Sequence, residues 1–286
     1  MALDPLALAA EVKEAELDRT IRDLAAFGTR YTFSAGNGEA RAYLAARLSG
    51  YGLPVEEDPF LVGGTAAANL VARKAGIGQE RGIYIFTAHY DSTSEDPDNL
   101  APGADDNASG VAAVLEAARI LAPLQLEQDV WFVLTGAEEQ GSLGSAQLVS
   151  WLVAQQLPVR GVIAPDMIGY WPLGDGDTLD ILGDEGSVAL VDTMDGVAGA
   201  LGVATHPWIQ HDYCYGDDHT NFQEAGFPAI SPMDCVEAHN VAHTHESLPH
   251  YHQTTDTPET VFLPLTAKVA GVIVATLAEL AQGGLP

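Results

Sequence analysis

The chain contains few basic residues for its length. Twelve lysines and arginines stand against 40 aspartates and glutamates among 286 residues, which gives a formal net charge of −28 at pH 7. A surface of this sign repels phosphate backbones and anionic membrane surfaces. We therefore expect neither nucleic acid nor a membrane as a partner. The acidity itself indicates solubility or a high-salt habitat rather than a particular chemistry.

Cysteines and long apolar runs are also scarce. The two cysteines, Cys214 and Cys235, are able to form one disulfide, and two buried free thiols are an equal alternative. We find no run that approaches the ~18 apolar residues of a membrane helix. The start, MALDPLALAAEVKEAE, carries acids where a secretory leader needs a basic flank. We expect a soluble chain, cytoplasmic as written, and secreted or periplasmic if a leader has been removed.

Aromatic residues make up only 7% of the chain, whereas 47% of it is hydrophobic and 29 residues are glycine. This composition suits helices packed tightly on a sheet better than a β-sandwich. The length allows one substantial core or two small ones. No repeat, low-complexity tract or shift in composition marks a boundary, so the simplest organisation is a single domain over residues 1–286.

Hydrophobic periodicity predicts helices and strands that alternate along the chain. Helical spacing covers 4–27, as one or two helices, and also 37–48 and 266–280, while residues 104–122 read as a loop that opens into a helix. Strand patterns cover 55–62, 68–72, 83–91, 129–141 and 161–170. The strands at 83–91 and 129–141 read as buried on both faces. The sequence therefore predicts an α/β fold with a mixed, centrally parallel sheet between layers of helices. Ligand sites in such sheets lie beyond the carboxyl ends of the strands.

Acidic residues and a histidine gather where the predicted buried strands end. The clusters are His89-Tyr90-Asp91, Asp105-Asp106, Glu138-Glu139 and Asp166. One acidic pair in a loop is usually a solvated surface. Four clusters at one edge of a sheet would repel one another unless a cation lay among them. Imidazole and carboxylate ligands without thiolate favour zinc over calcium or magnesium, and one shared carboxylate would allow two ions.

The chain resembles the M28 family of zinc peptidases in motifs that cover most of its length. They occur in family order as residues 25–52, HYD at 89–91, PGADDNASG at 102–110, GAEEQGSLGS at 136–145, DMIGY at 166–170, DDHTNFQEAGFPAI at 217–230 and YHQTTDT at 251–257. The resemblance implies an aminopeptidase that acts on peptides with a free N-terminus and uses two zinc ions.

The resemblance also implies a role for each site residue. His89 would bind one zinc ion, Asp105 would bridge both, Glu139 and Asp166 would each bind one, and His252 would complete the second site. Glu138 would be the catalytic base. A cis peptide bond between Asp105 and Asp106 is implied as well.

Elementary chemistry supports several of these roles. Asp91 lies two residues after His89, on the same side of a strand, where it is placed to accept the other ring N–H of the imidazole and fix its orientation. Glu138 and Glu139 are adjacent and point in different directions, so one is free to move protons while the other binds metal. Among the histidines near the C-terminus, we prefer His252 over His250 because only His252 lies in the family-like HQTTDT context.

The segment around Cys214 departs from the family pattern. Relatives carry a tyrosine near this position that stabilises the oxyanion, whereas here Cys214 lies at or beside it, between Tyr213 and Tyr215. The oxyanion donor is therefore unassigned. For Asp218 and His219 we predict structural hydrogen bonds beneath the metal site rather than a catalytic role.

Two other functions compete with the aminopeptidase. A glutaminyl cyclase relative keeps HYD, paired glutamates and DDH but uses a single zinc ion, and a receptor-like relative would have lost its metal ligands. The complete ligand set together with PGADDNASG favours the peptidase. The sequence indicates neither the preferred first substrate residue nor the oligomeric state.

Overall fold

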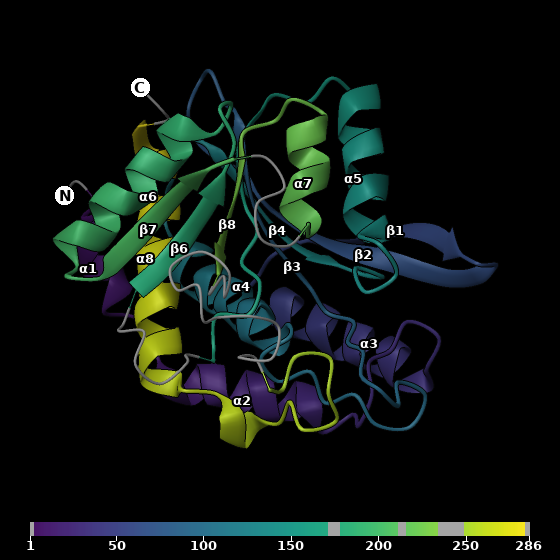
Figure 1. Ribbon diagram of the computed structural model, residues 1–286. Coiled ribbons are helices and arrows are strands. Elements are labelled where there is room, and N and C mark those ends of the chain that lie inside the picture. Colours follow the sequence, from purple (N-terminus) through teal and green to yellow (C-terminus); the bar gives the residue numbers. More distant parts are fainter. Residues whose placement is uncertain (1–2, 171–177, 211–215, 234–248, 284–286) are drawn as a thin grey trace.

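The computed structural model describes residues 3–170, 178–210, 216–233 and 249–283 (Figure 1). Their centre is an eight-stranded sheet in the order β1-β2-β4-β3-β5-β8-β6-β7. The strands are β1 (Val55–Val62), β2 (Thr65–Lys74), β3 (Ile83–His89), β4 (Asp129–Thr135), β5 (Val159–Ile163), β6 (Thr178–Gly183), β7 (Ala204–Ile209) and β8 (Ala229–Met233).

The sheet is mixed, with a parallel centre. β3 pairs in parallel with β4 and β5, β5 pairs in parallel with β8, and β6 pairs in parallel with β7. The pairs β1–β2, β2–β4 and β6–β8 are antiparallel. The predicted fold class is therefore confirmed. Because the central strands run the same way, the segments that follow β3, β4, β5 and β8 all leave the sheet at one edge.

Helices cover both faces of this sheet (Figure 1). They are α1 (Pro5–Ala9), α2 (Glu14–Ala25), α3 (Ala35–Gly50), α4 (Ala108–Leu121), α5 (Leu143–Ala154), α6 (Val188–Ala200), α7 (Asp218–Glu224) and α8 (Leu263–Gly283). On β3, Ile85 belongs to the core cluster that includes α5 and α7, whereas its neighbour Phe86 belongs to the larger core cluster of α2, α3, α4, α6 and α8. Consecutive strand residues thus fill two different cores, which explains the continuous apolar runs.

Helix α8 corrects one expectation from the sequence. Its 21 residues are long and apolar enough to span a membrane, although no run was expected to approach that length. However, 72% of its most apolar stretch is buried inside the protein, where it contacts α1, α2, α4 and α6. Packing in the core therefore accounts for the composition of this helix.

Other elements differ from the sequence pattern in extent. The N-terminal helical pattern forms two helices, α1 and α2, which is one of the two arrangements expected, with a turn at residues 10–13. Helix α3 begins at Ala35, two residues earlier than predicted, because the Ser34 side chain caps it by accepting a hydrogen bond from the Asn37 amide. The apolar pattern of the sequence predicted none of the elements α5, β6, α6, β7, α7 and β8.

Candidate active site

Five side chains from separate segments converge at the carboxyl edge of the sheet. His89 is the last residue of β3, Glu139 follows the end of β4 at Thr135, and Asp166 follows the end of β5 at Ile163. The loop that leads into α4 carries Asp106, and His252 comes from a segment of turns before α8. The convergence therefore depends on the parallel pairing of β3, β4 and β5 and on two loops.

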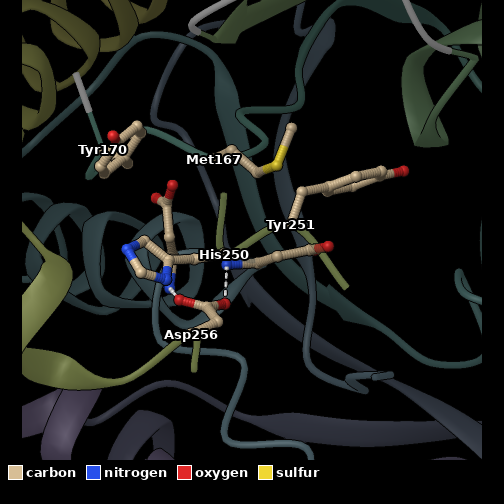
Figure 2. Close-up of a pocket in the computed structure, with 7 residues that line it drawn as sticks. Met167, Tyr170, His250, Tyr251 and Asp256 are labelled. Carbon is tan, nitrogen blue, oxygen red and sulfur yellow. Dashed lines mark hydrogen bonds between the residues drawn. The ribbon is translucent and has the colours of Figure 1, made fainter. Parts of the chain in front are cut away.

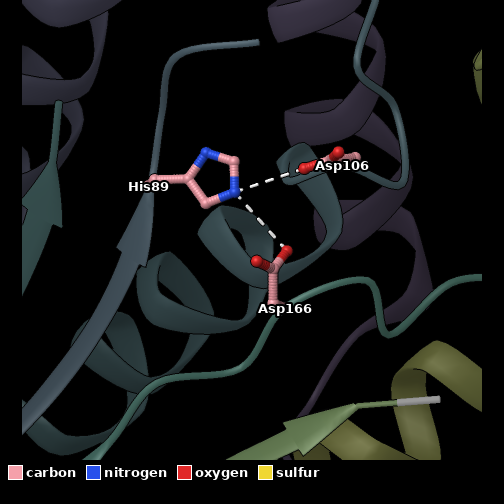
Figure 3. A group of neighbouring side chains, drawn as sticks. All are labelled: His89, Asp106 and Asp166. Carbon is pink, nitrogen blue, oxygen red and sulfur yellow. Dashed lines mark ion pairs between the residues drawn. The ribbon is translucent and has the colours of Figure 1, made fainter. Parts of the chain in front are cut away.

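Three of these side chains form a first group around one imidazole nitrogen (Figure 3). His89 Nε2 lies 3.2 Å from Asp106 Oδ1 and 3.4 Å from Asp166 Oδ1. We call His89, Asp106 and Asp166 the first trio. Their facing ligand atoms all lie within 4.8 Å of one another, close enough to share one metal ion.

A second group uses the other oxygen of the same aspartate. His252 Nε2 lies 3.2 Å from Asp106 Oδ2 and 3.0 Å from Glu139 Oε2. We call Asp106, Glu139 and His252 the second trio, which also meets the 4.8 Å spacing. Asp106 is thus common to both trios, with one oxygen directed to each.

The buried polar atoms of the trios fit a cation. His89 Nε2, Asp166 Oδ1 and Glu139 Oε1 are buried and lack a hydrogen bond of normal geometry, although His89 Nε2 and Asp166 Oδ1 lie within ion-pair distance of each other. Buried polar atoms without partners are rare in proteins, and several that converge fit the binding of a cation. Each trio combines one imidazole with two carboxylates, and this nitrogen and oxygen donor set is suited to zinc.

The electrostatics of the trios reflect burial and mutual contact. Burial raises the pKa of Asp166 to about 8 and that of Glu139 to about 7. Burial also acts to raise the pKa of Asp106, but hydrogen bonds with His252 and His89 outweigh it and lower the pKa below its usual range. The pKa of His252, although reduced by burial, is raised to about 10 by Asp106 and Glu139. Metal-free trios therefore retain protons that a cation would displace.

Asp105 does not occupy the shared position that the family resemblance assigned to it. Its carboxylate turns toward the loop after β5, where Oδ1 accepts the Gly169 N–H at 2.7 Å. Asp106, the next residue, faces both trios instead. The cis peptide bond is likewise one residue later than expected, between Asp106 and Asn107. The sequence of an adjacent acidic pair does not indicate which of the two aspartates faces the histidines. That depends on the backbone conformation of the loop.

Comparison with known families agrees with this geometry. The model of peptidase family M28 matches residues 69–277, well over half of the chain. This chain belongs to peptidase family M28. The expected enzyme class, a metallo-exopeptidase, is confirmed by this membership.

Individual relatives of this M28 peptidase span most of its length. A probable zinc metalloprotease of Pyrenophora tritici-repentis is 29% identical over 332 residues, covering 96% of this chain and 68% of the relative. Aminopeptidase YwaD of Bacillus subtilis is 31% identical over 151 residues, covering 52% of this chain and 27% of that protein.

Solved structures show the same fold. An aminopeptidase from Aneurinibacillus sp. strain AM-1 superposes with a TM-score of 0.82 at 18% identity, covering 99% of this chain and 98% of the other. Glutaminyl cyclase of Porphyromonas gingivalis superposes with a TM-score of 0.76 at 20% identity, covering 94% and 98%. The fold alone thus accommodates both of the enzyme types that the sequence left in competition.

Glu138 of this M28 peptidase lies beside the trios without joining either. It lines a cleft of about 150 Å³ together with Glu139, Asp166, Met233 and His252. The hydroxyl of Ser142 donates a hydrogen bond of 2.7 Å to Glu138 Oε1. Burial raises the pKa of Glu138 well above its usual range, partly opposed by His89. The side chain is therefore oriented in the cleft and prone to hold a proton.

The contact of Asp91 with His89 differs from the predicted one, because the Asp91 backbone carbonyl, and not its carboxylate, lies within hydrogen-bond distance of the His89 ring. His89 Nδ1 lies 3.2 Å from the Asp91 backbone carbonyl and 3.7 Å from its carboxylate. The Asp91 carboxylate accepts the backbone N–H groups of Glu138 and Glu139 at 3.1 Å and 3.2 Å, and the Thr32 hydroxyl at 3.2 Å. Asp91 therefore links the segment of His89 to the segment of the two glutamates.

Next to the cleft, Tyr170, His250, Tyr251 and Asp256 border a smaller pocket (Figure 2). His250 packs edge-on against Tyr170 with 5.7 Å between ring centroids, and its Nδ1 lies 2.9 Å from the Thr255 hydroxyl. His250 belongs to neither trio. The structure thus brings His252, rather than His250, to the converging carboxylates.

Asp218 and His219 lie behind the trios at the start of α7. The Thr135 hydroxyl donates to Asp218 Oδ2 at 2.5 Å, and the His219 ring contacts Asp217. Both side chains are buried. Cys214, its flanking tyrosines and Cys235, for which the sequence made predictions, lie outside the described residues.

Proposed function

We propose that this M28 peptidase is an aminopeptidase that uses two zinc ions. The first trio would hold one ion and the second trio the other, with Asp106 as the shared ligand. The observation that carries the proposal is the division of the two Asp106 oxygens between His89 and His252. The names of the relatives, a zinc metalloprotease and an aminopeptidase, agree with it.

The chemistry follows from the placement of Glu138. Zinc ions, when bound, polarise the scissile carbonyl and make water more acidic. The charge of the two cations would lower the pKa of the neighbouring Glu138 and leave it ionised. Glu138 would then take the proton from the attacking water and deliver it to the leaving amine. The Ser142 hydroxyl and the two backbone N–H groups bound by Asp91 hold Glu138 and its loop in place for this transfer.

The charge of the cleft supports selection of a free N-terminus. The cleft is lined by five carboxylates, those of Asp106, Glu138, Glu139, Asp166 and Asp217. Two zinc ions would compensate four of these negative charges, and the remaining carboxylate favours a cationic α-amino group. A peptide blocked at its N-terminus lacks that charge and would bind less well.

Glutaminyl cyclisation with a single zinc ion is the second candidate, because a cyclase shares the fold at a TM-score of 0.76. The complete second trio favours the peptidase, because a single ion in the first trio would leave His252 and Glu139 without a metal ion to bind. Metal analysis separates the two. We expect about two zinc ions per chain, whereas one ion together with cyclisation of N-terminal glutamine would support the cyclase.

Activity on a panel of aminoacyl p-nitroanilides tests the reaction itself. We expect hydrolysis of substrates with a free amino group, loss of hydrolysis after chelation, and recovery on addition of zinc. The same substrates with a blocked amino group serve as the control. Equal rates on free and blocked substrates would refute the exopeptidase assignment.

The role of Glu138 is tested by Glu138→Gln. Without a proton acceptor, kcat should fall about 10²- to 10⁴-fold, while the zinc content stays that of the parent because Glu138 belongs to neither trio. The exposed Glu80→Gln is the matched control. Near-normal turnover by Glu138→Gln would remove Glu138 from the mechanism.

A further inference from the structure

The second trio depends on a histidine held by no regular element. Residues 249–257 form turns without helix or strand. The His252 side chain is 37% exposed, far more than the 2% of His89. Its backbone has a φ of 54°, a left-handed conformation unusual for a residue other than glycine. Contacts between this segment and the rest of the protein must therefore fix the position of His252.

Asp256, four residues later, provides a buried contact between this segment and the loop of Asp106. Its side chain is almost completely buried. Oδ1 accepts the Asp105 N–H at 2.9 Å and Oδ2 accepts the Asp106 N–H at 3.0 Å (Figure 2). The Asp256 backbone carbonyl accepts the Ala104 N–H at 3.2 Å. Three successive amides of the Asp106 loop are thus bound by one residue of the His252 segment.

The contact of Asp256 with two successive backbone N–H groups has a counterpart elsewhere in the site. The Asp91 carboxylate binds the two amides of Glu138 and Glu139, as the Asp256 carboxylate binds the two amides of Asp105 and Asp106. Hydrogen bonds from backbone N–H groups to a carboxylate are stronger than neutral ones and fix the direction of the peptide. Each adjacent acidic pair therefore has its backbone oriented by a buried carboxylate from another segment.

A surface contact holds the other side of the same turn. Glu95, in the loop after β3, accepts the Thr254 N–H at 2.7 Å and the Thr254 hydroxyl at 2.6 Å. Thr254 lies midway between His252 and Asp256. The His252 segment is consequently fastened at two points, one buried and one exposed.

A buried arginine supplies positive charge beneath these contacts. Arg30 is fully buried, and its guanidinium donates to the carbonyls of Tyr90, Pro102 and Gly103 at 2.8, 2.5 and 2.8 Å. Burial lowers the pKa of Arg30 to about 10, opposed first by Asp256, so the group stays cationic at neutral pH. Arg30 thus joins the end of β3 to the Asp106 loop.

We propose that Asp256 is a positioning residue that fastens the His252 segment to the backbone of Asp106 and thereby sets the affinity of the second trio for its metal ion. Glu95 assists from the surface. The inference rests on the proposed two-metal function. It goes beyond that function because Asp256 contacts none of the ligand atoms and acts through the backbone alone.

Asp256→Asn tests the proposal with little change of shape. One accepting oxygen becomes an N–H donor that faces a backbone N–H, so one of the two contacts is lost. We expect the second site to bind metal about 10- to 100-fold more weakly, the usual effect of removing a supporting partner, and the first site to change by less than about twofold. Stepwise titration of metal-free protein with Co²⁺, followed by visible absorption and calorimetry, measures both affinities.

The control is Glu116→Gln, which alters a carboxylate that is also buried and lies on α4, paired with Arg119 at 2.5 Å. It should leave both affinities unchanged. Glu95→Ala, at the surface, should fold normally and weaken only the second site, about two- to fivefold. Circular dichroism of the metal-free proteins checks the fold of each variant.

The outcomes separate this inference from the proposed function. If the parent protein binds one metal ion only, the two-metal proposal fails. If the parent binds two and a folded Asp256→Asn binds both as tightly, or loses both equally, the role of Asp256 is refuted. Should Asp256→Asn fail to fold, Glu95→Ala decides, and an unchanged second affinity in that variant overturns the proposal.

Discussion

Asp105 and Asp106 follow each other in the chain, yet their carboxylates lie in different surroundings. Asp105 accepts the Gly169 N–H and is directed away from both histidines, whereas Asp106 faces His89 and His252. The difference arises because adjacent residues in an irregular loop point in different directions. The role of each aspartate therefore depends on the conformation of the loop before α4 as well as on its side chain.

Removing each aspartate in turn distinguishes their roles. We expect Asp106→Asn to lose both metal ions and all measurable hydrolysis, since it takes a ligand from each trio. Asp105→Asn should keep about two metal ions, although the altered contact with Gly169 would lower the free energy of unfolding by about 1–3 kcal/mol. The metal content of each variant after gel filtration shows which aspartate is needed to bind metal. Loss of metal in Asp105→Asn with Asp106→Asn unaffected would restore the original assignment.

At the scale of elements, the start of α5 presses on the loop that carries Glu138. Gly144 lies in the first turn of α5, and a Cβ atom there would approach the Gly136 carbonyl oxygen to 2.3 Å and Asn69 Oδ1 to 2.4 Å. The helix can begin this close to the end of β4 only because Gly144 has no side chain.

Gly144→Ala should therefore destabilise the protein, by about 1–3 kcal/mol, and lower activity because the Glu138 loop must shift. Gly199→Ala in α6 is the matched control, since a Cβ atom at Gly199 would meet nothing within 4 Å. That variant should be more stable by about 0.4–1 kcal/mol. Urea unfolding of both proteins measures the two effects, and equal changes would show that the contacts at Gly144 relax without cost.

For the whole molecule, the acidic site links stability to pH and to metal. In the metal-free protein, burial raises the pKa of Asp166 to about 8 and that of Glu139 to about 7. Contacts with Asp106 and Glu139 outweigh burial and raise the pKa of His252 to about 10. Between pH 6 and pH 9 the folded state thus binds more protons than the unfolded chain, so its stability falls as pH rises.

Chelated protein should accordingly show a Tm that decreases by several degrees from pH 6 to pH 9, since about 1 kcal/mol corresponds to about 2–4 °C at this size. Zinc-loaded protein should lack this decrease, because metal replaces the protons and binds more tightly as pH rises. Calorimetric scans of both forms at several pH values provide the measurement. A parallel decrease in both forms would contradict the linkage.

Much of the architecture could be predicted because buried positions recur along the chain as runs or periodic patterns of apolar residues. The apolar run at Ile83–His89 reads as a doubly buried strand, and β3 lies in the middle of the sheet with different cores on its two faces. Strands β6, β7 and β8 were missed: β6 carries Asp180 within its apolar residues, β7 is a largely exposed edge strand, and the five residues of β8 include Ser231 and Pro232. Asp256 was missed as well, although it follows His252 by four residues within one motif.

The fold class and the family could be read from the chain alone, since strand ends, residue types and motif order are all local properties. His89, Glu139, Asp166 and His252 could be nominated in this way. The folded chain was needed to see that Asp106 rather than Asp105 lies between His89 and His252, and that Asp91 and Asp256 each bind the backbone of an acidic pair. Those contacts join segments 47 to 151 residues apart, and no local pattern encodes the direction in which a loop side chain points.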